Sequence, residues 1–192
     1  MPKAGWWEEK YDTIYIMFSN PEKNVAQLGL REGMIVADFG SGTGFYARAA
    51  SARVGHTGKV YAIEVQKELV KSFEDELKKS SLKNIECIWG DIEKVGGTKI
   101  AEHTMDAVIL SNVLFQVSDK LGLIDEAKRI LKSDGKVLVV DWSESFGGMG
   151  PQPSDVFTKS KAEEFFSKRG FKFVEYINAG THHYGIIFKY ER

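Results

Sequence analysis

The sequence predicts an α/β fold: a doubly wound, mostly parallel sheet of seven strands that ends in a C-terminal antiparallel hairpin. Short apolar segments alternate with longer segments of helical periodicity throughout the chain. The apolar segments are continuous rather than alternating, as expected for parallel strands that helices cover on both faces. Repeated strand–helix–strand units of this size are typical of a doubly wound sheet with right-handed crossovers.

The parallel strands are expected at five apolar segments: Met34–Phe39, Lys59–Glu64, Ile85–Trp89, Met105–Leu110 and Lys136–Asp141. Asn20 followed by Pro21 is typical of a helix N-cap with proline in the first helical position. Further helices are expected at Phe45–Val54, Gln66–Ser80, Asp119–Leu131 and about Lys159–Arg169. A turn at Ser133-Asp134-Gly135 separates the third of these helices from the fifth strand.

The C-terminal part of the sequence predicts a long loop and then a hairpin. Residues 143–157 are too rich in glycine and proline for regular structure, which indicates a loop. Strands are expected at Phe171–Ile177 and Tyr184–Tyr190, with a turn at Asn178-Ala179-Gly180. Strands joined by so short a connection pair in the antiparallel sense.

Length and composition indicate one globular domain over residues 1–192. No segment is long and apolar enough for a membrane span, and the single cysteine, Cys87, excludes a disulfide framework and favours a reducing, cytoplasmic location. The net charge of −1, with acidic and basic residues interspersed, disfavours nucleic acid as a partner without excluding a local basic patch. The sequence indicates no oligomeric state.

A glycine-rich turn follows the first strand, with glycines at positions 40, 42 and 44. Such a turn between a strand and a helix lets a ligand approach the backbone closely, although glycine turns also occur for geometric reasons alone. A nicotinamide site requires a third glycine at position 45, where this chain has Phe45. Asp38 would sit badly beside a pyrophosphate and well beside a cationic sulfonium and ammonium. This pattern favours S-adenosylmethionine over a dinucleotide.

The segment Asp38-Phe39-Gly40-Ser41-Gly42-Thr43-Gly44 resembles the first motif of the class I S-adenosylmethionine-dependent methyltransferases. The resemblance continues through Glu64, Gly90-Asp91-Ile92, Ser111-Asn112 and the segment 126–138, and it covers about residues 20–190. It implies that Glu64 binds the ribose hydroxyls and that Asp91 accepts a hydrogen bond from the adenine amino group. It also implies that the Ile92 N–H donates to a ring nitrogen. The implied cofactor-binding residues are Asp38, Gly40, Ser41, Gly42, Gly44, Glu64, Val65, Asp91, Ile92, Ser111 and Asn112. Taken singly, Glu64 or Asp91 could instead cap a helix or a turn.

The residues that would act on the methyl acceptor are less well marked. The chain has Ser111-Asn112-Val113-Leu114 where amino-methyltransferases carry a proline pair, Cys87 is expected to be inert within a buried strand, and no metal-ligand cluster is visible. Asn112, His182 and His183 are the catalytic candidates; the two histidines could equally be structural or solvated. The segment 180–185 resembles the end of small methyltransferases of the ubiquinone/menaquinone-biosynthesis-like (type 11/25) group.

Five aromatic residues precede the sheet, within residues 1–20: Trp6, Trp7, Tyr11, Tyr15 and Phe18. They could form a flap or cap over the cofactor, or a helix packed on the edge of the sheet. The leading functional hypothesis is transfer of a methyl group from S-adenosylmethionine to a small-molecule acceptor, leaving S-adenosylhomocysteine. The alternatives are an RNA or protein methyltransferase, a non-catalytic S-adenosylmethionine-binding module and, disfavoured by the glycine spacing, a nicotinamide oxidoreductase.

Overall fold

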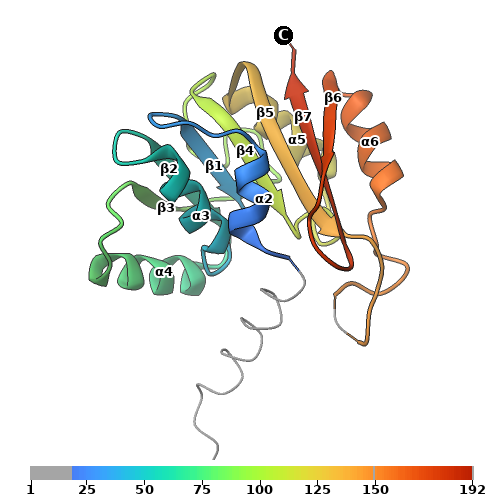
Figure 1. The fold of residues 1–192 in the computed structure, drawn as a ribbon, viewed down its shortest axis with the longest axis horizontal. Helices are drawn as coiled ribbons and strands as arrows, with labels where there is room; N and C mark the ends of the chain where they lie inside the picture. Colours follow the sequence, from blue (N-terminus) through green and yellow to red (C-terminus); the bar gives the residue numbers. More distant parts are fainter. Residues whose placement is uncertain (1–18, 149, 192) are drawn as a thin grey trace, which may run out of the picture.

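A seven-stranded sheet in the order β3-β2-β1-β4-β5-β7-β6 forms the centre of the computed structural model, which describes residues 19–148 and 150–191 (Figure 1). Pairs among the first five strands are parallel, whereas β7 pairs antiparallel with both β5 and β6. The predicted fold class is therefore confirmed, including the antiparallel hairpin. The aromatic residues of the proposed N-terminal flap, all within residues 1–18, lie outside the described residues.

The strands are β1 Ile35–Phe39, β2 Lys59–Glu64, β3 Ile85–Trp89, β4 Met105–Ser111, β5 Leu131–Trp142, β6 Phe171–Ile177 and β7 His183–Tyr190. The helices are α2 Pro21–Gln27, α3 Phe45–Val54, α4 Lys67–Lys79, α5 Lys120–Ile130 and α6 Lys159–Ser167. The N-cap expected before the first of these helices is present, because the Asn20 side chain accepts the Lys23 N–H at 2.8 Å. The segment 143–157 contains no helix or extended strand among its described residues.

Most predicted boundaries are correct within one or two residues, and the largest error is the start of β5. This strand begins at Leu131 rather than Lys136, because Leu131 leaves α5 directly and pairs with Met105. The register then shifts before Ala107 pairs with Lys136, so the predicted turn is an irregularity within the strand, with Asp134 at φ +67°. The predicted α6 boundary at Arg169 is also too late, since the helix ends at Ser167 and the chain reverses at Gly170, with φ +84°.

Both faces of the sheet are covered, which explains the continuous apolar strands. Helices α5 and α6 contribute to the core on one face, and α2, α3 and α4 to the core on the other; Figure 1 shows α2 and α3 in front of the sheet and α5 behind it. Alternate residues of one strand enter the two cores: Val137 and Val139 of β5 join the first, and Leu138 and Val140 the second. None of the described helices is long and apolar enough to cross a membrane.

Cys87 differs from its expected environment, because its side chain is half-buried rather than fully buried. Burial nevertheless raises the pKa of the thiol to about 11, so the side chain stays protonated at neutral pH. A protonated thiol is a poor nucleophile. The raised pKa, rather than full burial, therefore supports the expectation that Cys87 is inert.

Aromatic side chains attach α6 to the C-terminal hairpin. Phe166 is fully buried and stacks on Phe188 of β7, with ring centroids 4.6 Å apart, and meets Phe171 of β6 edge-on at 5.4 Å. Offset or edge-on ring pairs add about 0.5–1.5 kcal/mol to the free energy gained from area burial alone. Phe166 is therefore the main apolar contact between α6 and the sheet.

We expect Phe166→Ala to lower the free energy of unfolding by about 3–5 kcal/mol, because it empties a fully buried aromatic site. Phe173→Ala is the matched control, since Phe173 is 45% exposed on the edge strand and should cost less than about 1 kcal/mol. Urea unfolding followed by circular dichroism measures both. Equal losses for the two variants would contradict this packing.

Candidate functional site

The carboxyl ends of four neighbouring strands bring the predicted site residues to one edge of the sheet. The order β3-β2-β1-β4 places Asp91, Glu64, the glycine turn and Ser111-Asn112 next to one another. The start of α2 and the loop 143–157 reach the same edge, the lower one in Figure 1. Open parallel sheets bind ligands at this edge. The predicted juxtaposition of these four sites is therefore present.

The glycine turn is held in a conformation that side chains would obstruct. Gly40 and Ser41 donate their N–H groups to the Ile63 carbonyl at 2.9 and 3.0 Å. A Cβ atom on Gly44, which has φ +85°, would lie 2.1 Å from the Phe73 ring, so only glycine fits there. A Cβ on Gly42 would meet no atom of the described residues within 4 Å, so these residues leave open space above the middle of the turn.

Glu64 joins the glycine turn to the beginning of α4. Its Oε2 accepts the Gly42 N–H at 3.1 Å, and its Oε1 accepts the N–H groups of Val65 and Gln66 at 2.9 Å each. Glu64 thus caps the turn and the start of the helix, as the structural alternative in the sequence analysis predicted. A carboxylate has about four lone-pair positions, so Glu64 retains an acceptor site for a ligand hydroxyl.

Asp38 is the least satisfied carboxyl group of the edge. Its side chain is 2% exposed and its Oδ2 has no hydrogen-bond partner among the described residues. The pKa of Asp38 is raised to about 7, mainly by burial. A hydrogen bond from the Ala47 N–H opposes the rise, and the negative charge of Glu64 adds to it. A buried acceptor atom without a hydrogen bond costs free energy, and a ligand that donates to it would remove that cost.

A buried polar cluster that the sequence analysis missed lies beside Asp38. The Tyr46 hydroxyl accepts a hydrogen bond from the Asn24 side chain at 2.8 Å and lies 3.0 Å from the Ser19 hydroxyl. Tyr46 is also hydrogen-bonded to Ser111, so the cluster connects α2 and α3 to the end of β4. Asn24 and Tyr46 read as ordinary helix positions in the sequence, and no local signal marks them.

At the end of β3, Asp91 is partly exposed and stays ionised. Its Oδ1 accepts the Glu93 N–H at 3.0 Å and its Oδ2 meets the Lys94 ammonium at 3.0 Å. The hydrogen bond from Lys94 holds the pKa of Asp91 below its usual value. Ile92 is buried, and its Cδ1 lies 3.9 Å from the Cβ position of Gly40.

Asp141 at the end of β5 shapes the loop that follows β4. Its Oδ2 accepts the Leu114 N–H and its Oδ1 the Trp142 N–H, each at 2.8 Å. Burial raises the pKa of Asp141 to about 7, against the opposing effect of these N–H groups. The sequence analysis did not single out Asp141, although a carboxylate at a strand end is the signal that identified Asp38 and Glu64.

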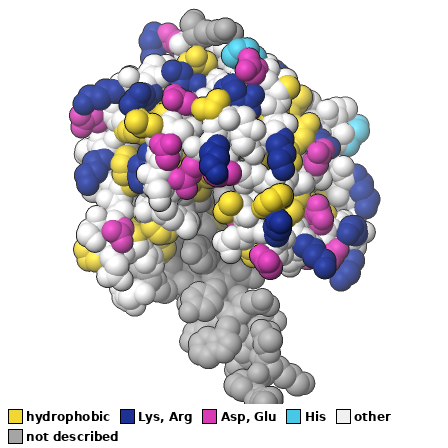
Figure 2. All heavy atoms as spheres, turned by 180° about the vertical axis from the view of Figure 1, so that it is seen from behind, with side chains coloured by type: hydrophobic (Ala, Val, Ile, Leu, Met, Phe, Trp, Pro, Cys, Tyr) yellow, Lys and Arg dark blue, Asp and Glu magenta, His cyan; other side chains and the backbone are white. Residues whose placement is uncertain are grey.

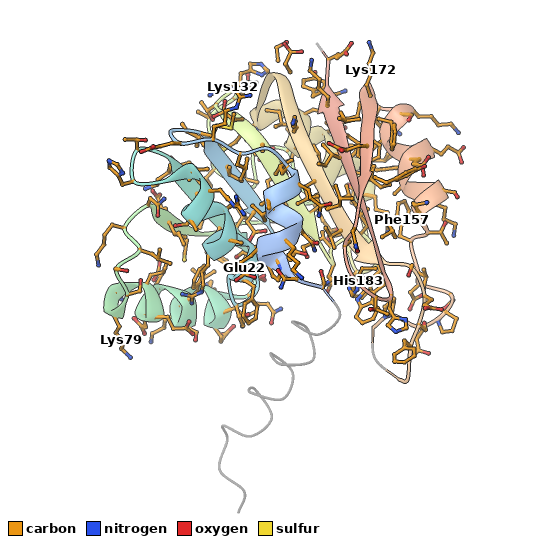
Figure 3. All side chains as sticks on the ribbon, viewed as in Figure 1. Glu22, Lys79, Lys132, Phe157, Lys172 and His183 are labelled. Carbon is orange, nitrogen blue, oxygen red and sulfur yellow. The ribbon has the colours of Figure 1, made fainter. Side chains whose placement is uncertain are left out.

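Two of the three catalytic candidates meet beside the end of β5. Nε2 of His183 lies 3.0 Å from Oδ1 of Asn112, a residue held at φ +55°. Nδ1 of His183 lies 3.2 Å from the Thr181 carbonyl, and the ring packs on Trp142 at 4.3 Å. Burial lowers the pKa of His183, so the ring is neutral at neutral pH and donates one hydrogen bond only. In Figure 3, His183 lies at the lower edge, where the parallel strands have their carboxyl ends.

His182 points instead to the loop 143–157. Its Nδ1 meets Glu144 at 2.7 Å, and its ring stacks on Phe146 with centroids 3.8 Å apart. The Ser143 N–H also donates to the His182 carbonyl at 2.8 Å. These contacts attach the loop to the start of β7, so the third catalytic candidate has a loop-anchoring position.

Trp142 lies at the end of β5, paired with His183 of β7. Its side chain is 3% exposed, and its Nε1 has no partner among the described residues. A Cβ on Gly150 would lie 2.7 Å from the indole, which shows that the loop backbone packs directly on this ring. Within residues 19–148 and 150–191, no group of three His, Cys, Asp or Glu side chains is arranged to hold a metal ion.

Comparison with known proteins identifies the family. A model described as "Methyltransferase domain" matches residues 30–184. The fold is similar to that of a SAM-dependent methyltransferase from Aquifex aeolicus, with a TM-score of 0.84, 28% identity and coverage of 94% of this chain and 97% of that chain. A putative type 11 methyltransferase from Sulfolobus solfataricus follows, with a TM-score of 0.72, 25% identity and coverage of 91% and 94%.

The curated relatives are longer than this chain, which matches only part of each. The ubiquinone/menaquinone biosynthesis C-methyltransferase UbiE of Escherichia coli O1:K1 / APEC is 32% identical over 120 residues, which cover 60% of this chain and 45% of that protein. The arsenite methyltransferase of Halobacterium salinarum is 28% identical over 124 residues, which cover 65% and 30%. The chain thus spans about a third to a half of the curated relatives it matches. Because the family model covers most of the chain, the protein belongs to the class I S-adenosylmethionine-dependent methyltransferases.

Proposed function

We propose that this protein transfers a methyl group from S-adenosylmethionine to a small-molecule acceptor. The observation that carries the proposal is Asp38, a buried carboxyl group whose Oδ2 has no hydrogen-bond partner within residues 19–148 and 150–191. It lies at the base of a glycine turn that these residues leave open. A cationic ligand would supply the missing partner and favour the ionised carboxylate. The ammonium and sulfonium of S-adenosylmethionine have that charge, whereas the pyrophosphate of a dinucleotide has the opposite one.

The other residues of the edge fit the remaining parts of the cofactor. As the family resemblance implies, Glu64 would accept hydrogen bonds from the ribose hydroxyls and Asp91 would accept one from the adenine amino group. The Ile92 N–H would donate to a ring nitrogen. The open space above Gly42 leaves room for the ligand chain between Asp38 and Glu64. When bound, S-adenosylmethionine supplies an electrophilic methyl group on a sulfonium, which in-line displacement transfers to a nucleophile.

The contribution of this chain to the reaction is to position the reactants and to exclude water. Holding donor and acceptor in an attack geometry supplies much of the acceleration of such a displacement. Asn112, His183 and Trp142 lie beside the end of β4, where the acceptor would approach. The neutral His183 ring and the buried indole N–H of Trp142 provide polar groups at this place. We assign Asn112 and His183 to acceptor positioning.

A small molecule is favoured over a polymer as acceptor. Figure 2 shows basic and acidic side chains interspersed over the face it displays. Polyanion binding depends on basic residues that neutralise several phosphates together. UbiE and arsenite methyltransferase, among the relatives, are named for small-molecule reactions.

Calorimetric titration with S-adenosylhomocysteine and with NAD tests the cofactor. We expect binding of S-adenosylhomocysteine and no comparable response to NAD. Preferential binding of NAD would overturn the proposed function. If S-adenosylhomocysteine binds but no acceptor in a broad metabolite panel receives a methyl group, the proposed transfer to a small molecule is wrong. The protein is then a non-catalytic binding module.

The affinity for S-adenosylhomocysteine should increase with pH. Because the pKa of Asp38 is about 7 in the free protein and a bound ammonium favours the carboxylate, binding releases a proton at lower pH. Linkage then gives about tenfold weaker binding at pH 6 than at pH 8. Calorimetry in buffers of different ionisation enthalpy measures both the affinity and the released proton.

Asp38→Asn should remove this pH dependence and weaken binding by about tenfold to a hundredfold, the cost of losing a charge-assisted hydrogen bond. Asp75→Asn, on the exposed surface of α4, should keep both the affinity and its pH dependence. Asp141, whose pKa is also about 7, is present in both variants and cannot produce a difference between them. An unchanged profile in Asp38→Asn would exclude Asp38 as the linked group.

His183→Ala should separate acceptor binding from cofactor binding. We expect the affinity for S-adenosylhomocysteine to change less than about threefold, while methyl transfer falls about tenfold or more through lost acceptor positioning. His56→Ala is the control, since His56 is exposed and lies at the opposite edge of the sheet, after α3. Full activity of His183→Ala would show that the Asn112–His183 contact has no part in the reaction.

A further inference from the structure

We propose that the buried ion pair of Glu126 and Arg129 on α5 positions Asp91 and thereby sets the selectivity of the cofactor site for adenine. The inference rests on the proposed function, because it assumes that Asp91 meets the adenine amino group. It assigns a role to two residues that contact neither cofactor nor acceptor. Glu126 and Arg129 are therefore positioning residues.

The segment that carries Asp91 consists of turns and irregular backbone. Residues 90–104, all of them described, join β3 to β4 without a helix or strand. Backbone N–H groups of such a segment need partners from elsewhere when they are buried. The position of Asp91 therefore depends on what the rest of this segment binds.

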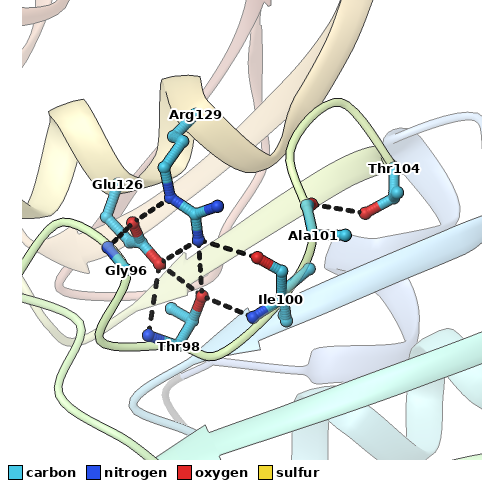
Figure 4. Close-up of polar contacts among 7 residues, drawn as sticks. All are labelled: Gly96, Thr98, Ile100, Ala101, Thr104, Glu126 and Arg129. Carbon is cyan, nitrogen blue, oxygen red and sulfur yellow. Dashed lines mark hydrogen bonds and ion pairs between the residues drawn. The ribbon is translucent and has the colours of Figure 1, made fainter.

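Glu126 supplies those partners from the neighbouring helix (Figure 4). Its side chain is fully buried, and its Oε2 accepts the Gly96 N–H at 2.6 Å. Its Oε1 accepts the Thr98 N–H at 3.2 Å and the Thr98 hydroxyl. Arg129 donates to both oxygens of Glu126 at 2.7 Å and to the Ile100 carbonyl at 2.8 Å. We call Glu126 and Arg129, with these contacts, the clamp.

Gly97, which lies between the two residues that Glu126 binds, is hydrogen-bonded to Asp91. The Asp91 N–H donates to the Gly97 carbonyl at 3.2 Å, and the Gly97 N–H donates to the Lys94 carbonyl at 2.8 Å. A Cβ on Gly97 would lie 2.1 Å from the Asp91 carbonyl, so the two backbones are in close contact. Because Gly97 lies between the two residues that Glu126 binds, a shift of the clamp moves the backbone of Asp91.

The beginning of α5 contacts the same segment at a second place. A Cβ on Gly122 would lie 1.9 Å from the Glu93 carbonyl, so the helix and the segment touch through their backbones. The Asp119 N–H also donates to the Glu93 side chain. Helix α5 and its N-cap thus contact the segment 90–104 at several places along its length.

The charge of Glu126 is stable. Burial favours its neutral form, but hydrogen bonds from Arg129, Thr98 and Gly96 outweigh burial and hold the pKa below its usual value. The ionised carboxylate accepts at both oxygens. Glu126→Gln keeps the shape of the side chain but replaces one acceptor oxygen by a donor NH2, which leaves at least one of these N–H groups without a partner.

Selectivity for adenine follows from the placement of Asp91. An ionised carboxylate accepts hydrogen bonds only, so it favours the amino group of adenine and repels the carbonyl oxygen that hypoxanthine carries at the same position. Sites that hydrogen-bond one group and leave its analogue unpaired discriminate strongly. A displaced Asp91 loses that discrimination while the homocysteine end of the ligand is held as before.

The test compares S-adenosylhomocysteine with S-inosylhomocysteine, its 6-oxo analogue, by calorimetry on the full chain. In Glu126→Gln we expect the affinity for S-adenosylhomocysteine to fall about tenfold, and that for the analogue to change less than about threefold, so that discrimination falls. Glu164→Gln is the matched control, since Glu164 is exposed on α6 and pairs with Lys168. Equal weakening of both ligands in Glu126→Gln would show a general structural role and overturn the proposal.

Thr98→Val keeps the proposal testable if Glu126→Gln does not fold. It removes the hydroxyl that donates to Glu126 while leaving the ion pair intact, and it should lower the discrimination in the same direction by a smaller factor, about threefold. Unchanged discrimination in a folded Thr98→Val would count against the clamp. Failure of the unmodified protein to bind S-adenosylhomocysteine would overturn the proposed function itself, and so is distinct from either result.

Discussion

Buried carboxylates supply the hydrogen bonds that the loops at the carboxyl edge cannot make within themselves. Glu64 binds the N–H groups of the glycine turn and of the start of α4, Asp141 binds those of the loop after β4, and Glu126 binds those of the segment after β3. Loops of this kind have no repeating backbone pairing, so each requires an external acceptor. The geometry of the whole edge depends on these three side chains.

The carboxyl groups of the edge differ in charge state because their partners differ. Glu126 faces a guanidinium and stays ionised, whereas Asp38 and Asp141 face only neutral donors, and burial raises their pKa values to about 7. An ionised carboxylate that lacks a cationic partner is costly in a buried site. Of the two raised groups, only Asp38 has an oxygen without a partner among the described residues, which is why we propose a cationic ligand there.

The fold and the meeting of polar strand ends at one edge of the sheet were predictable from the sequence, because both follow from local patterns. Continuous apolar segments marked the strands, and polar residues at their ends marked Asp38, Glu64 and Asp91, which the parallel topology then brings together. Contacts between distant segments were not predictable: Asn112 meets His183 across the end of β5, and Tyr46 meets Asn24 between two helices. The early start of β5 was missed because Leu131 leaves α5 without an intervening turn residue.

A crystal structure of the complex with S-adenosylhomocysteine tests the central claim most directly. The account predicts the ammonium of the ligand within hydrogen-bonding distance of Oδ2 of Asp38, the ribose hydroxyls at Glu64 and the chain of the ligand above Gly42. A ligand bound away from Asp38, with that oxygen still unpartnered, would contradict it.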